Sequence, residues 1–137
     1  MKHSADMETR LRDAKLRPTR QRVALAEIMF GKGDRHLSAE KLYDEAREAG
    51  VAVSLATIYN TLHQFTKNGL LRAISIDSSK TYFDTNTGNH HHFFYEDSEE
   101  VVDMPDGYVT VGNLPAPPEG MEVSRVDVIV RVRNNPA

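Results

Sequence analysis

The sequence predicts an α+β protein built from two modules, a helical module that ends in a β-hairpin and a smaller α/β module. Helical periodicities are confined to the first half of the chain, a pair of short strands follows them, and the charge reverses at Phe83. Residues 1–83 carry 14 basic and 10 acidic side chains, a net charge of +4, whereas residues 84–137 carry 3 and 10, a net charge of −7. A basic half joined to an acidic half indicates two modules.

The first 30 residues are predicted to contain two helices. Pro18 disfavours helical geometry at Arg17 but suits the first turn of a helix, so a short helix comes first and an amphipathic helix spans Thr19 to Phe30. The two glycines at 31 and 33 then end this second helix.

Two further helices are expected downstream, and each begins at a serine that can cap it. Ser38 precedes a helix that ends at Gly50, and Ser54 precedes a helix that ends at Gly69. Because the connection between them is short, the pair is a helix-turn-helix candidate.

The last of these helices has one apolar face and one polar face. Asn and Gln side chains can pair with adenine edges, a Thr methyl or a Tyr ring can contact a thymine methyl, and Lys can neutralise phosphate. An ordinary solvated helix face is the alternative interpretation. The polar residues are Thr57, Tyr59, Asn60, His63, Gln64 and Lys67.

The neighbouring segments favour DNA. Residues 70–76 and 81–83 read as two strands joined by the polar turn 77–80, which would form a wing. Upstream, residues 10–22 hold six cations opposed only by Asp13, enough to contact several phosphates or enter a minor groove. These cations are Arg10, Arg12, Lys15, Arg17, Arg20 and Arg22.

A histidine triplet follows the polar, turn-prone segment 84–89, which suits a hinge. In a strand, His90 and His92 point to one face and His91 to the other. Two imidazoles need further donors to hold a transition metal, and Asp84 and His36 are the candidates if the hinge folds back. A polar strand start without a ligand is the alternative.

The C-terminal module is expected to depend on apolar burial and on a partner subunit. A strand over residues 126–132 places valines on one face. Prolines at 105, 115, 117 and 118 leave room only for a short helix or turn between Gly107 and Leu114. Modules of about fifty residues seldom suffice alone.

The chain has 137 residues and no cysteine, which excludes disulfides, thiolate zinc sites, Cys nucleophiles and Cys-ligated haem. Any metal must therefore use His, Asp or Glu. No apolar run approaches the ~20 residues that a membrane span needs, and no export leader is evident. We expect a cytoplasmic protein without membrane association.

The chain contains five motifs in a fixed order: Leu16-Arg17-Pro18-Thr19-Arg20-Gln21-Arg22, His36-Leu37-Ser38-Ala39-Glu40, Ala56-Thr57-Ile58-Tyr59-Asn60-Thr61-Leu62, Gly69-Leu70 and His90-His91-His92. Together they resemble the ferric uptake regulator (Fur) family, and the resemblance covers residues 10–104. The resemblance implies a winged helix-turn-helix domain at 1–83, a hinge at 84–89 and an α/β dimerisation and effector-sensing domain at 90–137. The implied assembly is a homodimer, or a higher oligomer, on double-stranded operator DNA.

The resemblance also assigns roles to individual residues. Tyr59 would touch bases in the major groove, and Arg17, with Arg20 nearby, would supply the cation of the minor groove. Asn60 stands where the family has Arg, so the operator should differ and Asn60 could read adenine. The implied interdomain regulatory metal site consists of His36, Asp84, His90 and His92.

Tyr95 and Ser98 stand where much of the family has the Cys-x-x-Cys pair of a structural zinc, so that thiolate zinc site cannot form. The histidine triplet, the absent thiols and the interrupted C-terminal helix resemble the iron response regulator (Irr) branch. That branch implies control of iron and haem genes, mainly by repression when iron is scarce. Haem bound at His90, His91 and His92 would then weaken DNA binding.

Two alternatives remain open at this point. One is a repressor that responds directly to Fe, Mn or Zn through the four metal ligands. The other, of a different class, is a small metal-dependent hydrolase, but the chain has no HExxH signature, paired acid-base motif or nucleophile elbow. We therefore expect a regulator and not an enzyme.

Overall fold

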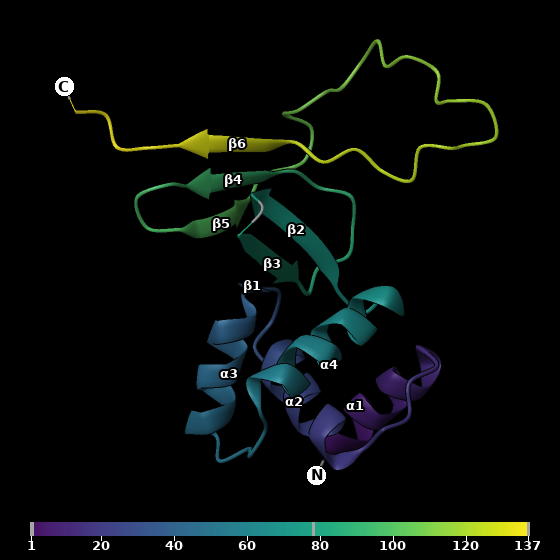
Figure 1. Ribbon diagram of the computed structural model, residues 1–137, viewed down its shortest axis with the longest axis vertical. Coiled ribbons are helices and arrows are strands. Elements are labelled where there is room, and N and C mark those ends of the chain that lie inside the picture. Colours follow the sequence, from purple (N-terminus) through teal and green to yellow (C-terminus); the bar gives the residue numbers. More distant parts are fainter. Residues whose placement is uncertain (1, 78, 137) are drawn as a thin grey trace. The chain divides into compact units, whose positions relative to one another are not determined.

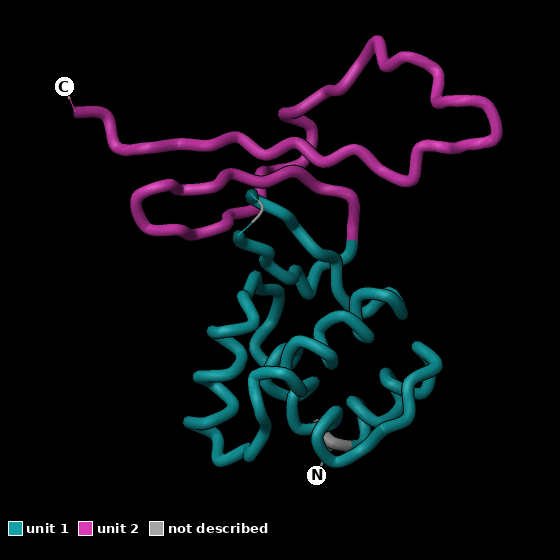
Figure 2. Tube along the Cα trace, viewed as in Figure 1, with its two compact units in different colours: residues 1–87 teal, residues 88–137 magenta. Residues whose placement is uncertain are grey.

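The computed structural model describes residues 2–77 and 79–136, and the chain divides into two compact units. Unit 1 comprises residues 1–87 and unit 2 comprises residues 88–137 (Figure 2). All four helices belong to unit 1, whereas unit 2 is built from strands and a long loop (Figure 1). Along the described ranges, no helix has the length and apolarity that crossing a membrane requires.

Unit 1 contains the helices and the hairpin that the sequence predicts, together with one strand that it does not. The short first helix, the helix after Pro18 and the two serine-capped helices are all present. The elements are α1 (Lys2–Asp13), α2 (Arg20–Phe30), β1 (His36–Leu37), α3 (Ala39–Glu48), α4 (Leu55–Lys67), β2 (Arg72–Asp77) and β3 (Lys80–Asp84).

Side-chain hydroxyls start three of these helices. The Oγ atoms of Thr19, Ser38 and Ser54 each accept a hydrogen bond from the backbone N–H three residues further along. The Ser38 and Ser54 caps are as predicted, and Thr19 is the cap of α2 and not its first residue. Each cap is worth about 1 kcal/mol because it satisfies a donor that the helix itself cannot pair.

Three helices each end in a turn of the same left-handed type. Lys15, Gly50 and Gly69 follow α1, α3 and α4 with φ angles of 64°, 75° and 82°. In each turn the next residue donates to a carbonyl five residues back, an arrangement that pairs otherwise orphaned helix carbonyls. These bonds, all 2.8 Å long, join Leu16 to Leu11, Val51 to Ala46 and Leu70 to Phe65.

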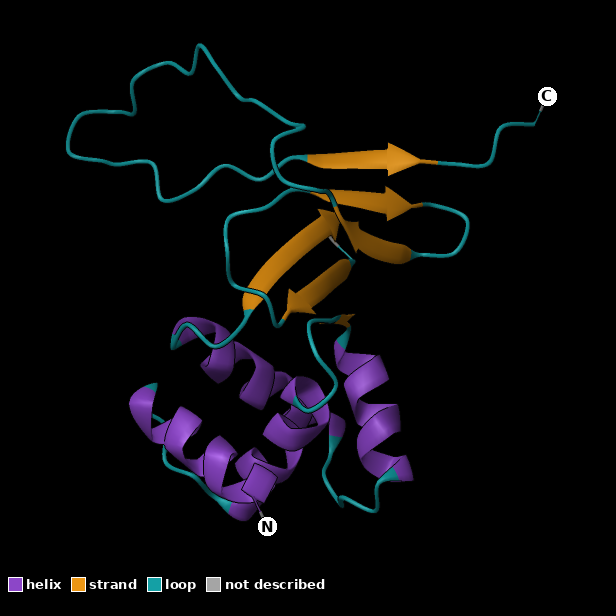
Figure 3. Ribbon diagram, turned by 180° about the vertical axis from the view of Figure 1, so that it is seen from behind, coloured by secondary structure: helices purple, strands orange, loops and turns teal. Residues whose placement is uncertain are grey.

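The core of unit 1 lies among its four helices, which gather around one another when the molecule is seen from behind (Figure 3). The apolar face of α4 contributes Ile58, Leu62 and Phe65, all fully buried. Phe83 of β3 extends the same core to the sheet. The polar face of α4 therefore has to point outward. Other core members are Leu11, Leu25, Met29, Leu37 and Leu42.

The sheet of unit 1 is antiparallel, with the strand order β1-β3-β2. Strand β1 was not predicted, because two residues are too short for any periodicity to be read. It pairs His36 with Asp84 and Leu37 with Phe83. Asp84, which the sequence places at the start of the hinge, is instead the last residue of β3. Ser78 of the predicted turn lies outside the described residues.

Unit 2 is a three-stranded sheet in the order β5-β4-β6. Strand β4 (His92–Tyr95) pairs antiparallel with β5 (Glu100–Asp103) and parallel with β6 (Ile129–Val132). Phe94 and Val101 face each other across the β4–β5 pair, and both are buried.

One prediction for unit 2 was wrong in extent. The strand expected over residues 126–132 is only β6 (Ile129–Val132). Val130 is 38% exposed in the single chain, and the burial of the valine face against a partner subunit stays a prediction. Of the short helix or turn expected between Gly107 and Leu114, the turn is what forms, and the whole described stretch 104–128 is turn and loop. The prolines explain why no helix forms there, since they lack the N–H donor that helices and sheets require.

Lys15 offers a direct test of these helix ends, because it adopts a left-handed conformation that glycine reaches without strain and that strains a residue with a side chain. We expect Lys15→Gly to raise the free energy of unfolding by about 1 kcal/mol, since a side chain at such a position costs ~1–2 kcal/mol. Urea unfolding monitored by circular dichroism measures it. Gly50→Ala, the matched control, should lower stability by a similar amount. A Lys15→Gly protein no more stable than the parent would contradict the assignment.

Candidate DNA-binding face and metal ligands

The polar face of α4 is presented outward, as the sequence predicts. Asn60, His63, Gln64 and Lys67 are exposed, and Tyr59 is 38% exposed. The cause is the burial of the opposite face, described above. This face is polar and hydrogen-bonding over its whole length.

Thr57 and His63 also have structural roles on this face. The Oγ1 atom of Thr57 lies 3.0 Å from the Oγ atom of Ser54, so it takes part in the helix cap. The rings of His63 and Phe83 form a T-shaped contact, with 6.3 Å between centroids. Both contacts hold the side chains in one orientation at the start and in the middle of α4.

The Tyr59 phenol donates a hydrogen bond to Oε1 of Glu40 at 2.6 Å. This bond joins the two helices of the helix-turn-helix, since Glu40 lies in the first turn of α3. Its presence lowers the pKa of Glu40 and raises the pKa of Tyr59. Glu40 belongs to the motif that begins at His36, but its contact with Tyr59 was not predicted, because nothing local signals a contact between residues 19 apart.

Of the six cations of residues 10–22, three make side-chain contacts with named partners in unit 1, and the other three are described by their exposure. Arg10 lies over the ring of Phe30 at 3.9 Å from the centroid, and Arg12 forms an exposed ion pair with Glu8. Arg22 forms side-chain hydrogen bonds within unit 1. The side chains of Lys15, Arg17 and Arg20 are exposed.

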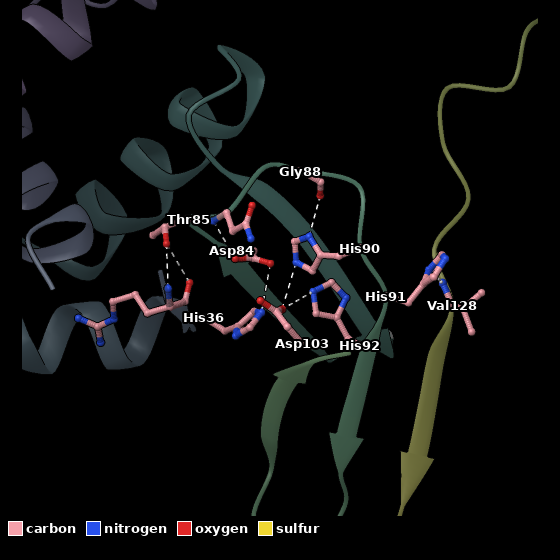
Figure 4. Close-up of polar contacts among 11 residues, drawn as sticks. His36, Asp84, Thr85, Gly88, His90, His91, His92, Asp103 and Val128 are labelled. Atoms are coloured by element: carbon pink, nitrogen blue, oxygen red, sulfur yellow. Dashed lines mark hydrogen bonds and ion pairs between the residues drawn. The ribbon is translucent and has the colours of Figure 1, made fainter. Parts of the chain in front are cut away.

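Unit 1 contributes one pair of the predicted metal ligands, His36 and Asp84. The β1–β3 register places them opposite each other, with 3.1 Å between Nε2 of His36 and Oδ2 of Asp84 (Figure 4). The other carboxylate oxygen, Oδ1, accepts a hydrogen bond from the backbone N–H of Asn86 at 2.8 Å. The pair thus comes from two strands far apart in sequence.

Arg35 anchors the segment that carries His36. Its guanidinium makes two hydrogen bonds to the Glu45 carboxylate of α3 and a third, of 3.3 Å, to the carbonyl of Ile28 in α2. Its backbone N–H donates to Oγ1 of Thr85 at 2.9 Å. The Glu45 hydrogen bonds raise the pKa of Arg35, and the same bonds lower the pKa of Glu45. Two helices and the end of β3 therefore meet beside the ligand pair.

Unit 2 contributes His90 and His92, together with an acidic residue that the sequence did not single out. Nε2 of His90 and Nε2 of His92 lie 3.1 and 3.2 Å from Oδ1 of Asp103 (Figure 4). The ligand atoms of these three residues lie within 4.8 Å of one another. Asp103 was missed because only the β4–β5 register brings it opposite His92.

A backbone hydrogen bond orients the ring of His90. Its Nδ1 lies 2.7 Å from the carbonyl oxygen of Gly88, and because a carbonyl can only accept, Nδ1 is the donor and Nε2 faces Asp103. Metal-ligating histidines are usually held by such a bond, which fixes the tautomer and the ring orientation.

His91 points away from its two neighbours, as strand alternation predicts. Its Nδ1 accepts a hydrogen bond from the backbone N–H of Val128 at 3.1 Å, just before β6 (Figure 4). His91 therefore ties the last strand to β4 and takes no part in the cluster around Asp103.

A helix-turn-helix followed by a hairpin, together with histidine–carboxylate clusters, defines a winged-helix regulator with metal-ligand candidates. Residues 13–130 match the model of the ferric uptake regulator family. The chain belongs to this family.

Relatives support the same conclusion. The ferric uptake regulation protein of Pseudomonas aeruginosa is 35% identical over 100 residues, which are 72% of this chain and 75% of that protein. The protein of the same name from Vibrio cholerae serotype O1 is 31% identical over 106 residues, 77% of this chain and 71% of the relative. The solved structure of the P. aeruginosa regulator with manganese matches with a TM-score of 0.71 and 29% identity. The match covers 93% of this chain and 97% of the chain in that structure. The chain is a metal-responsive transcriptional regulator of the Fur family.

Glu45→Gln tests the anchor of the His36 segment. We expect the variant to lose about 2 kcal/mol of unfolding free energy at pH 7, because charge-assisted hydrogen bonds to a largely buried guanidinium are removed. The pKa of Glu45 is lowered on folding, so its contribution is present above the ordinary value near 4.5 and is lost as the pH falls through the lower folded value. Urea unfolding from pH 7 to pH 3 should show the two proteins converging in acid. A constant difference across that range would contradict the prediction.

Proposed function

We propose that this protein is a cytoplasmic, non-enzymatic repressor that binds double-stranded operator DNA as a homodimer and responds to a divalent metal ion. The single observation that carries the metal response is the convergence of two imidazole Nε2 atoms on Asp103, with one ring oriented by the Gly88 carbonyl. Asp103 extends the ligand set that the sequence predicted. The fold of unit 1 supports the DNA-binding half of the proposal.

The proposed DNA contacts come from two elements of unit 1. Tyr59 and Asn60 would contact base edges, with Asn60 suited to adenine. Arg17 and Arg20, both exposed, would contact phosphate or the minor groove. Thr57, His63, Gln64 and Lys67 complete the face of α4.

The proposed metal ligands are His36 and Asp84 of unit 1 and His90 and His92 of unit 2, with Asp103 added. Imidazole and carboxylate donors suit Fe(II), Mn(II) or Zn(II). The positive charge of a bound ion would attract both the imidazole nitrogens and the carboxylate oxygens. The two units contribute donors separately, so an ion bound by both pairs would favour one arrangement of the units over others. The effect on DNA binding is then limited by the difference in metal affinity between arrangements.

The absence of cysteine gives the proposed site its chemical character. Tyr95 and Ser98 offer no thiolate, so a Cys-ligated structural zinc is excluded by composition. Metal binding in this chain would therefore use nitrogen and oxygen donors.

An Irr-like response to haem is the second candidate, and the three consecutive histidines favour it. It would repress iron and haem genes under iron limitation, with haem at His90, His91 and His92 lowering DNA affinity. The contacts within unit 2 give more support to a metal ion. His91 already accepts from Val128, and the Nε2 atoms of the other two converge on one carboxylate.

Tyr59→Ala tests the DNA-binding half. The test uses a duplex that the parent protein selects from random sequence. We expect Tyr59→Ala to lower the affinity for this duplex by tenfold or more, about the size of one lost base contact. The affinity for a scrambled duplex should change little. Fluorescence anisotropy in the presence of MnCl₂ measures both. Leu55→Ala, on the same helix but partly exposed and apolar, is the matched control. Equal losses on both duplexes would argue against base contact by Tyr59.

His90→Ala/His92→Ala and Asp103→Asn test the metal half. Calorimetric titration with MnCl₂ should show no tight binding in the double variant and about a 10- to 100-fold weaker affinity in Asp103→Asn. His63→Ala should bind Mn²⁺ like the parent. Unchanged Mn²⁺ affinity in the double variant would overturn the assignment. In a parallel haemin titration, a Soret shift lost only in the histidine variants, with operator release, would favour the haem response instead.

A further inference from the structure

The guanidinium of Arg22 lies between two parts of the proposed DNA-binding face. Its Nη1 donates to the backbone carbonyl of Arg17 at 2.9 Å, and its Nη2 donates to Oε1 of Gln64 at 2.9 Å. Arg17 lies in the loop between α1 and α2, whereas Gln64 lies on α4. One side chain thus connects the loop cation to the base-reading helix.

The backbone of Arg22 is itself held in place. Its N–H donates to Oγ1 of Thr19, the cap of α2, at 3.2 Å. A guanidinium is a planar, rigid fork whose donors diverge at fixed angles, so it can hold two acceptors at a set separation. A lysine ammonium at the end of a flexible stem has no such fixed geometry.

The contact also determines how Gln64 is presented. Arginine has donors and no acceptor, so only the amide oxygen of Gln64 can face it, and the assignment of Oε1 follows without ambiguity. Bidentate reading of adenine requires that oxygen to accept from the base N6 amino group. With Oε1 directed at Arg22, Gln64 presents its amide nitrogen, a donor suited to acceptors such as a purine N7, guanine O6 or thymine O4.

We propose that Arg22 is a positioning residue for sequence recognition: it sets the spacing between Arg17 and α4 and orients Gln64 as a hydrogen-bond donor toward DNA. The sequence grouped Arg22 with the cations available for phosphate, a role that would affect all DNA sequences equally. The proposed role affects sequence preference. This inference rests on the proposed DNA-binding function.

Salt dependence separates the two roles. Each phosphate contact contributes about 0.9 to the slope of log affinity against log salt concentration. We expect Arg22→Met and Arg22→Lys to lower the ratio of the affinity for the selected duplex to that for the scrambled duplex by about tenfold, the size of one lost base contact. The slope of log affinity against log salt concentration should stay unchanged. Arg20→Met, which removes an exposed cation from the same helix, should lower the slope and shows the change expected from a lost phosphate contact.

Anisotropy titrations of the full-length protein with MnCl₂, at a series of KCl concentrations, supply both quantities. If Arg22→Met lowers the slope and weakens both duplexes equally while Arg22→Lys matches the parent, Arg22 is a phosphate contact and the inference fails. If random-sequence selection with the parent protein enriches no duplex, the proposed DNA-binding function itself is wrong. That result differs from a failure of the Arg22 inference, in which the parent protein still selects a duplex.

A double-variant cycle tests the connection to Gln64. Gln64→Ala should lower the ratio by itself, and adding Arg22→Met should lower it little further, because both changes break the same link. Losses that multiply would overturn the inference. Thermal unfolding of each variant establishes that the folded protein is being compared.

Discussion

The burial of the apolar face of α4 is the interaction on which the rest of unit 1 depends. Ile58, Leu62 and Phe65 are fully enclosed by the other helices, and their burial supplies several kcal/mol. Because side chains three and four apart share a helix face, this burial alone turns Tyr59, Asn60 and Lys67 outward. The polar contacts of the face then refine the position of individual side chains.

Several of the side chains proposed to bind DNA or metal are held in position by hydrogen bonds from neighbouring residues that are not proposed to bind a ligand. Glu40 holds the Tyr59 phenol, and Arg35 with Glu45 holds the strand that carries His36. In unit 2 the Gly88 carbonyl orients His90. Residues that meet a ligand are thus supported by residues that do not, and such support is what keeps binding geometry within narrow limits.

Much of this architecture could be predicted from sequence because the signals are local. Serine caps, glycine helix ends, Pro18 and the apolar spacing of α4 each act within a few residues. The alternation of the histidine triplet is equally local and holds in the structure. The extent of β6 was overestimated, because the alternation of valines from residue 126 was read as strand throughout, whereas only Ile129–Val132 pairs with β4.

What the sequence by itself determined is the order of the helices and the hairpin of unit 1, the polar face of α4, the reversal of charge and the exclusion of thiolate chemistry. Only the tertiary structure decided which side chains meet. Strand register brought Asp84 to His36 and Asp103 to His92, and helix packing brought Arg22 to Gln64, 42 residues away. The reason is physical: periodicity fixes the direction of a side chain on its own element, whereas its partner depends on how separate elements pair and pack.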